Sequence, residues 1–127
     1  MPVRTSLLSR AQHRAFGETM RHEMLLSTAR VAVVASGDLA HTNDDTSKHA
    51  PTNAMAFDRT IQRLLTHDPA AIASMDETLV ANDVGQCLFR PLLTLLGILG
   101  THHYRASVLS YEAPFGAGYL TATIDLG

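Results

Sequence analysis

A continuous apolar run from Val31 to Ala35 constrains the fold more than any other segment of the sequence. It reads Val-Ala-Val-Val-Ala and is bounded by Arg30 on one side and by Ser36 and Gly37 on the other. A strand with one wet face alternates apolar and polar residues, whereas a continuous β-branched run is typical of a strand covered on both faces. The run therefore predicts a buried strand in a parallel or mixed sheet of an α/β protein.

The pattern of apolar and turn residues predicts the remaining elements. Apolar residues at helical spacing predict one amphipathic helix from Ala11 to Thr28 and another from Asn53 to Thr66. The polar stretch from Thr42 to Pro51 predicts a loop after the buried strand. Further helical pieces are expected after an Asp68 N-cap through Ala73, from Asp76 to Asn82, and from Leu88 to Leu99, where Gly100 ends the helix. Two strands are expected from Ala106 to Tyr111 and from Tyr119 to Ile124. The predicted fold is an α/β domain with a mixed sheet and flanking helices that ends in an antiparallel hairpin.

Length, charge and cysteine content exclude several classes of protein. A chain of 127 residues forms one domain at most. The net charge of -2 and the lack of a Lys/Arg block argue against a nucleic-acid surface or a polybasic membrane anchor. The single Cys87 excludes an internal disulfide framework, and the sequence has neither a signal peptide nor an apolar stretch long enough to span a bilayer. We therefore expect a cytoplasmic protein.

Asp38 and His41 follow the predicted buried strand directly. In open α/β sheets, ligands bind beyond the carboxyl ends of the strands, and Gly37 allows a sharp turn there. With a spacing of three residues, the carboxylate can reach the imidazole, fix its tautomer and raise its basicity, as a general acid/base histidine requires. The alternative is that Asp38 caps a helical turn and His41 is an ordinary loop histidine.

Three ordered segments resemble one enzyme family. The segments Val31 to His41, Asp83 to Pro91 and Val108 to Tyr119 are similar to signature regions of the class III extradiol ring-cleavage dioxygenases, the LigB-type catalytic-subunit superfamily. Phe57 and Asp58 also match a pair that recurs in that family. The Memo-like proteins share the same fold, and the resemblance runs from about Phe16 to Ile124.

The resemblance implies a non-haem Fe(II) enzyme that opens catecholic rings with O2. Members of the family bind the iron through two histidines and one carboxylate, and a further histidine acts as acid/base. That acid/base role falls on His41, with Asp38 as its orienting partner. Because both histidine ligands come from the part of the family fold before the Val31 strand, we expect residues 1–127 to form the C-terminal half of a LigB-like domain, without the N-terminal metal-binding half.

The carboxylate ligand of the iron falls, by the same resemblance, in the segment from Asp83 to Cys87. Asp83 is the candidate ligand, and Gln86 cannot supply a negative charge. In the Memo-like branch a cysteine lies near the metal, which makes Cys87 an alternative ligand. Its other interpretation is a buried thiol in the packing at the start of a helix.

Two further residues are candidates for substrate binding. Arg90 would neutralise an acidic group of the substrate, or it is a surface cation at a helix start. Glu112 lies on the substrate side of its strand, or at a solvated strand end. His13 and His22 face different sides of one helix and are expected to be solvated rather than to chelate one ion. The same solvated state is expected for the remaining histidines, His49, His67, His102 and His103.

The preferred interpretation is the C-terminal part of an extradiol dioxygenase that contributes the acid/base histidine. Its partners would be a catecholic substrate and O2 in a completed site, together with a second copy of the chain or a partner subunit. The alternative is a non-catalytic Memo-like module that associates with itself or with a partner. A metal-dependent hydrolase assembled from the histidines is a further alternative.

Overall fold

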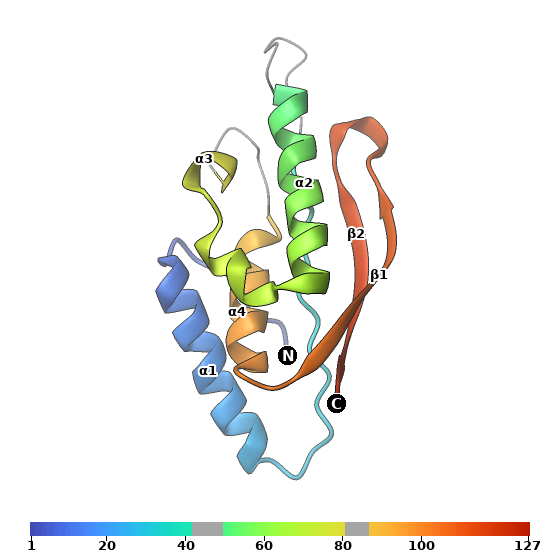
Figure 1. Cartoon of the computed structure of the whole chain (residues 1–127). Helices are drawn as coiled ribbons and strands as arrows, with labels where there is room; N and C mark the ends of the chain where they lie inside the picture. The colour runs from blue at the N-terminus through green and yellow to red at the C-terminus, as the bar shows by residue number, and fades with distance from the viewer. Residues whose placement is uncertain (42–49, 81–86) are drawn as a thin grey trace.

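The computed structural model describes residues 1–41, 50–80 and 87–127, with the side chains of 50–53 and of Phe115 left out of the description. Figure 1 shows α4 between α1 and the β-hairpin, with α2 running alongside the hairpin. The elements are α1 (Arg10–Leu26), α2 (Ala50–His67), the 3-10 helix η1 (Pro69–Ser74), α3 (Glu77–Val80), α4 (Phe89–Leu99), β1 (Tyr104–Glu112), the 3-10 helix η3 (Pro114–Gly116) and β2 (Tyr119–Leu126).

The hydrophobic core lies where α2, η1 and α4 meet the loop before residue 42. Phe57 and Ile61 on α2 are fully buried, and the Phe57 ring packs edge-on against Phe89 of α4 at a centroid distance of 6.3 Å. Each large apolar side chain buried in this way contributes about 1.5–3 kcal/mol to folding. The buried apolar residues of this core are Leu39, Ala40, Ala54, Phe57, Ile61, Leu65, Ile72, Met75, Leu88, Phe89, Leu92, Leu93, Leu96 and Leu99.

The predicted antiparallel hairpin is confirmed. Strands β1 and β2 pair in the register Tyr104↔Leu126 to Glu112↔Tyr119, with an irregularity between Val108 and Ser110. Both strands extend beyond the predicted limits. Together with the flanking helices the hairpin gives an α/β fold, and the described part of the sheet has two strands.

The predicted helices are present, but α1 packs differently from the expected apolar stripe. The buried residues of α1 are His13 and Gly17, whereas Phe16 and Leu25 are exposed by 42% and 70%. A Cβ at Gly17 would lie 2.9 Å from the Gly97 Cα and would also collide with the Thr94 carbonyl oxygen of α4. The two helices therefore cross backbone to backbone, a contact that a pattern of apolar residues does not reveal.

Gly17→Ala is expected to lower the free energy of unfolding by about 1–3 kcal/mol, because the added methyl group overpacks the crossing with α4. In an unconstrained helix the same change stabilises by about 1 kcal/mol, so the sign of the change in unfolding free energy shows whether α1 and α4 are in backbone contact. Urea unfolding measures it. Gly127→Ala is the control, since the nearest atom to the added Cβ is the His103 carbonyl oxygen, at an ordinary contact distance of 3.8 Å. A more stable Gly17→Ala protein would contradict the described crossing.

The prediction of a buried strand from Val31 to Ala35 is wrong for the described structure. The run is extended but has no strand partner in the described residues, and Val31, Val33 and Val34 are exposed by 51%, 38% and 84%. A strand exists only when a neighbour supplies its hydrogen bonds, and a run of valines cannot supply that neighbour.

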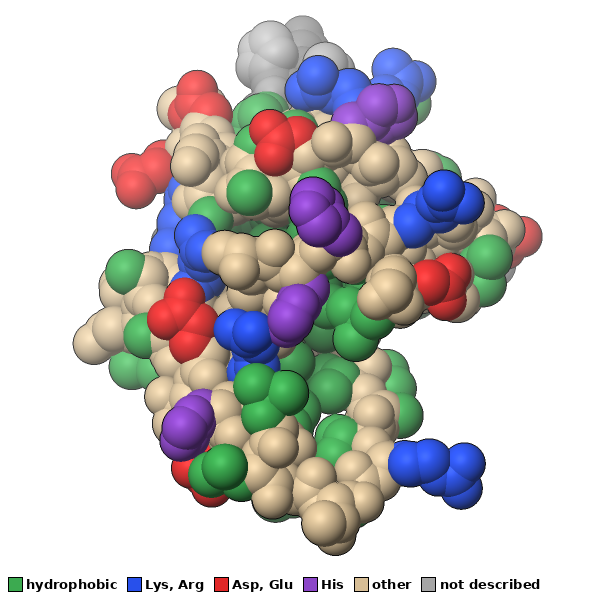
Figure 2. Space-filling model, turned by 60° about the horizontal axis from the view of Figure 1, so that its bottom comes forward, with side chains coloured by type: hydrophobic (Ala, Val, Ile, Leu, Met, Phe, Trp, Pro, Cys, Tyr) green, Lys and Arg blue, Asp and Glu red, His purple; other side chains and the backbone are tan. Residues whose placement is uncertain are grey.

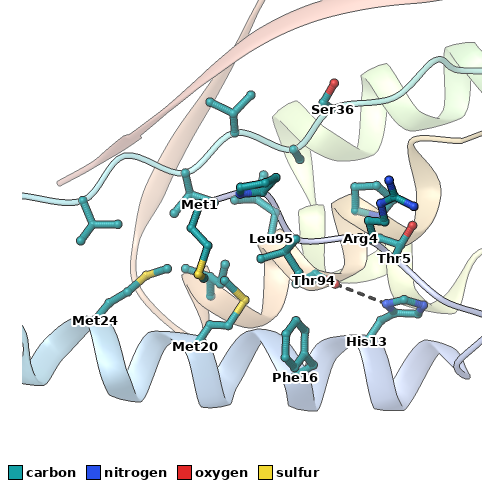
Figure 3. A pocket seen from close by; sticks show the side chains of 18 of the residues that line it. Met1, Arg4, Thr5, His13, Phe16, Met20, Met24, Ser36, Thr94 and Leu95 are labelled. Atoms are coloured by element: carbon teal, nitrogen blue, oxygen red, sulfur yellow. Dashed lines mark hydrogen bonds between the residues drawn. The ribbon is translucent and has the colours of Figure 1, made fainter.

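Two apolar hollows flank this extended segment. The larger, of about 820 Å³, lies between the segment, α1 and α4, and Figure 3 shows Phe16, Met20 and Met24 of α1 and Leu95 of α4 around it. The smaller, of about 570 Å³, lies between the segment, α4 and β2. Figure 2 shows a hollow lined by hydrophobic side chains at one end of the molecule, with acidic and basic side chains interspersed over the surrounding face.

Several other boundaries differ from the predictions. Helix α2 already includes Pro51, which was expected in the loop, and residues 42–49 of that loop lie outside the described residues. Asp68 precedes η1 as expected, but its side chain makes no capping hydrogen bond. Helix α3 ends at Val80, and the rest of the helical piece expected to reach Asn82 lies outside the described residues. No helix in the described ranges combines the length and apolar character needed to cross a membrane.

Candidate functional site

The loop that carries Asp38 and His41 is fixed against the start of β2. The Leu39 N–H donates to the Gly118 carbonyl at 2.8 Å, and the Gly118 N–H donates to the Ala40 carbonyl at 3.0 Å. His41 then forms an antiparallel bridge with Ala117. Leu39 and Ala40 are almost fully buried, so the two polar side chains on either side of them extend from a rigid anchor.

The structure brings Asp38 and His41 together. Their Oδ2 and Nε2 atoms are 3.2 Å apart, and the side chains are 40% and 22% exposed, respectively. The His41 Nε2 atom is itself buried and makes no hydrogen bond of good geometry in the described structure. The two side chains are therefore a close pair of a partly exposed carboxylate and a partly exposed imidazole, in which the carboxylate is placed to orient the ring.

Cys87 is joined to this loop through the main chain. The Asp38 carbonyl accepts from the N–H of Cys87 at 3.1 Å and from the N–H of Leu88 at 3.0 Å. A Cβ at Gly37 would lie 2.7 Å from the Leu88 nitrogen, so the close approach requires glycine. The Cys87 thiol is free and exposed, which corrects the interpretation of a buried thiol.

Asp58 is a site residue that the sequence indicated only as half of a family pair. It is a carboxylate on the apolar face of α2 and is 3% exposed. Its Oδ1 atom accepts from the Ala40 N–H at 2.9 Å, and its Oδ2 atom accepts from the Tyr111 hydroxyl at 2.6 Å. Burial raises the pKa of Asp58, while the Tyr111 hydroxyl, the Ala40 N–H and the charge of His41 act in the opposite direction.

Tyr111 is the partner of Asp58 on β1. Burial, the hydrogen bond to Asp58 and the negative charge of Asp58 raise the pKa of Tyr111 to about 12. The phenol is therefore a hydrogen-bond donor over the whole physiological pH range.

Asp58→Asn is expected to become more stable relative to the natural protein as the pH rises above about 4. The pKa of Asp58 is raised in the folded state, so the folded natural protein binds the proton of this carboxyl more tightly than the unfolded chain does. The stability that this proton contributes is lost as the pH rises and Asp58 ionises. Asparagine has no charge to bury and does not titrate. Thermal unfolding of both proteins from about pH 4 to 7 measures the difference in Tm, and an unchanged difference across that range would contradict the raised pKa.

The other candidate site residues are either exposed or outside the described residues. Asp83 and Gln86 lie outside the described residues. Arg90, in the first turn of α4, and Glu112, at the end of β1, are both exposed. Within residues 1–41, 50–80 and 87–127, no three His, Cys, Asp or Glu side chains gather as a metal site would require.

The structure corrects the expectation for one of the two histidines of α1. His13 was expected in solvent but is 2% exposed. One ring nitrogen lies 3.4 Å from the Thr94 hydroxyl (Figure 3), and the other lies 3.1 Å from the Ser6 carbonyl. His13 therefore links the N-terminal segment, α1 and α4. His22 is exposed, as expected.

An α/β fold with a carboxylate–imidazole pair in a loop beside the hairpin is compatible with an acid/base enzyme. Residues 1–122 match the family described as the catalytic LigB subunit of aromatic ring-opening dioxygenase. The chain belongs to this LigB family, which confirms the resemblance drawn from its three segments.

One curated relative is also similar. Protein CA_C1420 of Clostridium acetobutylicum is 32% identical over 88 residues, which cover 68% of this chain and 19% of the relative. The chain thus spans about a fifth of the length of that relative.

Proposed function

We propose that this chain supplies the acid/base pair of an extradiol dioxygenase that opens catecholic rings with O2. The observation that carries the proposal is the His41–Asp38 pair, 3.2 Å apart, in a loop that belongs to the segment matched by a catalytic LigB subunit. The match to a catalytic subunit favours this enzymatic function over a non-catalytic binding module.

The proposed chemistry at His41 is proton transfer. With Nε2 beside the Asp38 carboxylate, the tautomer protonated on Nε2 leaves Nδ1 to accept the proton of a catechol hydroxyl. The products of that step are a phenolate and an imidazolium, and Asp38 stabilises the imidazolium charge until the proton is returned to the opened ring. Arg90 and Glu112 are proposed to bind polar groups of the substrate.

The described residues do not by themselves form an Fe(II) site. We propose that the iron ligands combine Asp83, or alternatively Cys87, with histidines from a partner subunit that carries the N-terminal metal-binding half. The exposed Val31, Val33 and Val34 and the apolar hollows beside them support such an association, because apolar surface of this kind is usually covered. No step of the proposed proton transfer depends on how the iron is held.

His41→Gln is expected to lower kcat by about 10²–10⁴-fold, since glutamine cannot transfer a proton. Asp38→Asn is expected to lower it less, because the histidine remains. O2 uptake with a panel of catechols measures both, using the chain with Fe(II), alone and co-expressed with the products of neighbouring reading frames. His22→Gln, on the exposed side of α1, is the control and should retain full activity. Equal rates for His41→Gln and the natural protein, or no ring opening of any catechol, would contradict the proposal.

The isolated monomer is expected to retain less than one Fe(II) per chain. Iron analysis and sedimentation on the same sample measure this, after anaerobic loading and removal of free metal. Asp83→Asn and Cys87→Ser show which residue contributes to any iron held by an associated form. A monodisperse monomer that binds stoichiometric Fe(II) tightly would contradict the need for a partner subunit.

A further inference from the structure

Asp58 is a buried charge that the proposed proton transfer does not use. A carboxylate that is 3% exposed on the apolar face of a helix strongly destabilises the fold unless its oxygens are well partnered. The neighbouring Phe57 and Ile61 already attach α2 to the core by apolar packing. A helix that is held in this way needs no ionisable group at this position, so the carboxylate requires another explanation.

The two oxygens of Asp58 bind groups from two different parts of the site. One binds the main-chain N–H of Ala40, which lies in sequence between Asp38 and His41. The other binds the hydroxyl of Tyr111 on β1. A Cβ at Gly118 would collide with this second oxygen, so glycine is needed where the carboxylate passes the start of β2.

The anchor at Ala40 limits how the catalytic pair can move. The Ala40 N–H is held by Asp58 and its carbonyl by Gly118, at 2.9 and 3.0 Å. Asp38 and His41 extend from the chain on either side of this fixed residue. Asp58 is therefore one of the groups that hold the main chain from which the two side chains, 3.2 Å apart, extend.

We propose that Asp58, itself held by Tyr111, is a positioning residue that fixes the His41 ring relative to Asp38. The catalytic meaning of this role rests on the proposed function of His41. The positioning itself is a property of the free chain and can be measured without substrate or iron. Asp58 touches neither the proposed substrate nor the reacting atoms, and acts through the Ala40 peptide.

A double-mutant cycle read by NMR tests the positioning. The measured quantity is the change in the ¹H–¹³C signals of the His41 ring on Asp38→Asn, with the ring assigned from His41→Gln. In the natural protein this change is large, because the carboxylate lies beside the ring. In an Asp58→Ala background it is expected to fall to less than about half, since the two side chains are no longer held together.

Two controls separate positioning from general loosening of the fold. Ile61→Ala removes a buried side chain one turn further along α2 and should leave the response of His41 to Asp38→Asn intact. Asp58→Asn retains a carbonyl oxygen for the Ala40 N–H and should restore most of the response. If Asp58→Ala fails to fold, Tyr111→Phe removes one hydroxyl and is expected to reduce the response partially.

Two results would overturn the proposal. One is a change in the His41 ring signals on Asp38→Asn that is equally large in the natural protein and in the Asp58→Ala background. If Asp58→Ala does not fold, the same comparison is made with the Tyr111→Phe background. The other is an equal loss of the response in Ile61→Ala. Both are independent of enzymatic activity, so a failed O2-uptake assay would refute the proposed function and leave the positioning result unaffected.

Discussion

The buried carboxylate of Asp58 is the interaction on which the arrangement of the candidate site depends. It joins α2, β1 and the loop before residue 42, and it passes the start of β2 where only glycine leaves room. The apolar core brings these parts together without specifying direction, because hydrophobic burial is not directional. Hydrogen bonds to a charged group are directional and strong, and they determine which main-chain atoms face each other.

The fold was predictable from the sequence wherever local periodicity decides the structure. Helices α2 and α4 and the hairpin follow from apolar spacing and turn residues, and they lie close to their expected limits. The prediction of a strand from Val31 to Ala35 was wrong because a strand is defined by its hydrogen-bonded neighbours, and no strand of the described chain pairs with this segment. The prediction of how α1 packs was wrong because Gly17 and Gly97 allow a backbone contact that a pattern of apolar residues does not indicate.

The candidate site was predictable to the extent that its residues are close in sequence. Asp38 and His41 are three residues apart, and their side chains meet at 3.2 Å as expected. The turn expected at Gly37 is not present, and this glycine instead allows the close approach to Leu88. Asp58 and Tyr111 are 53 residues apart, so their hydrogen bond depends on the fold as a whole. A single acidic residue within the apolar stripe of α2 was the local signal for it, because such a group is rarely buried without a partner.

The Asp38 carbonyl, which accepts from the N–H groups of both Cys87 and Leu88, joins the loop of the candidate site to the start of α4. Leu88 immediately precedes α4, and Asp38 carries the carboxylate beside His41. A displacement of the Cys87 main chain is therefore transmitted through these hydrogen bonds to the residue whose carboxylate lies beside His41. The start of α4 and the carboxylate–imidazole pair are thus connected directly, through hydrogen bonds of the main chain.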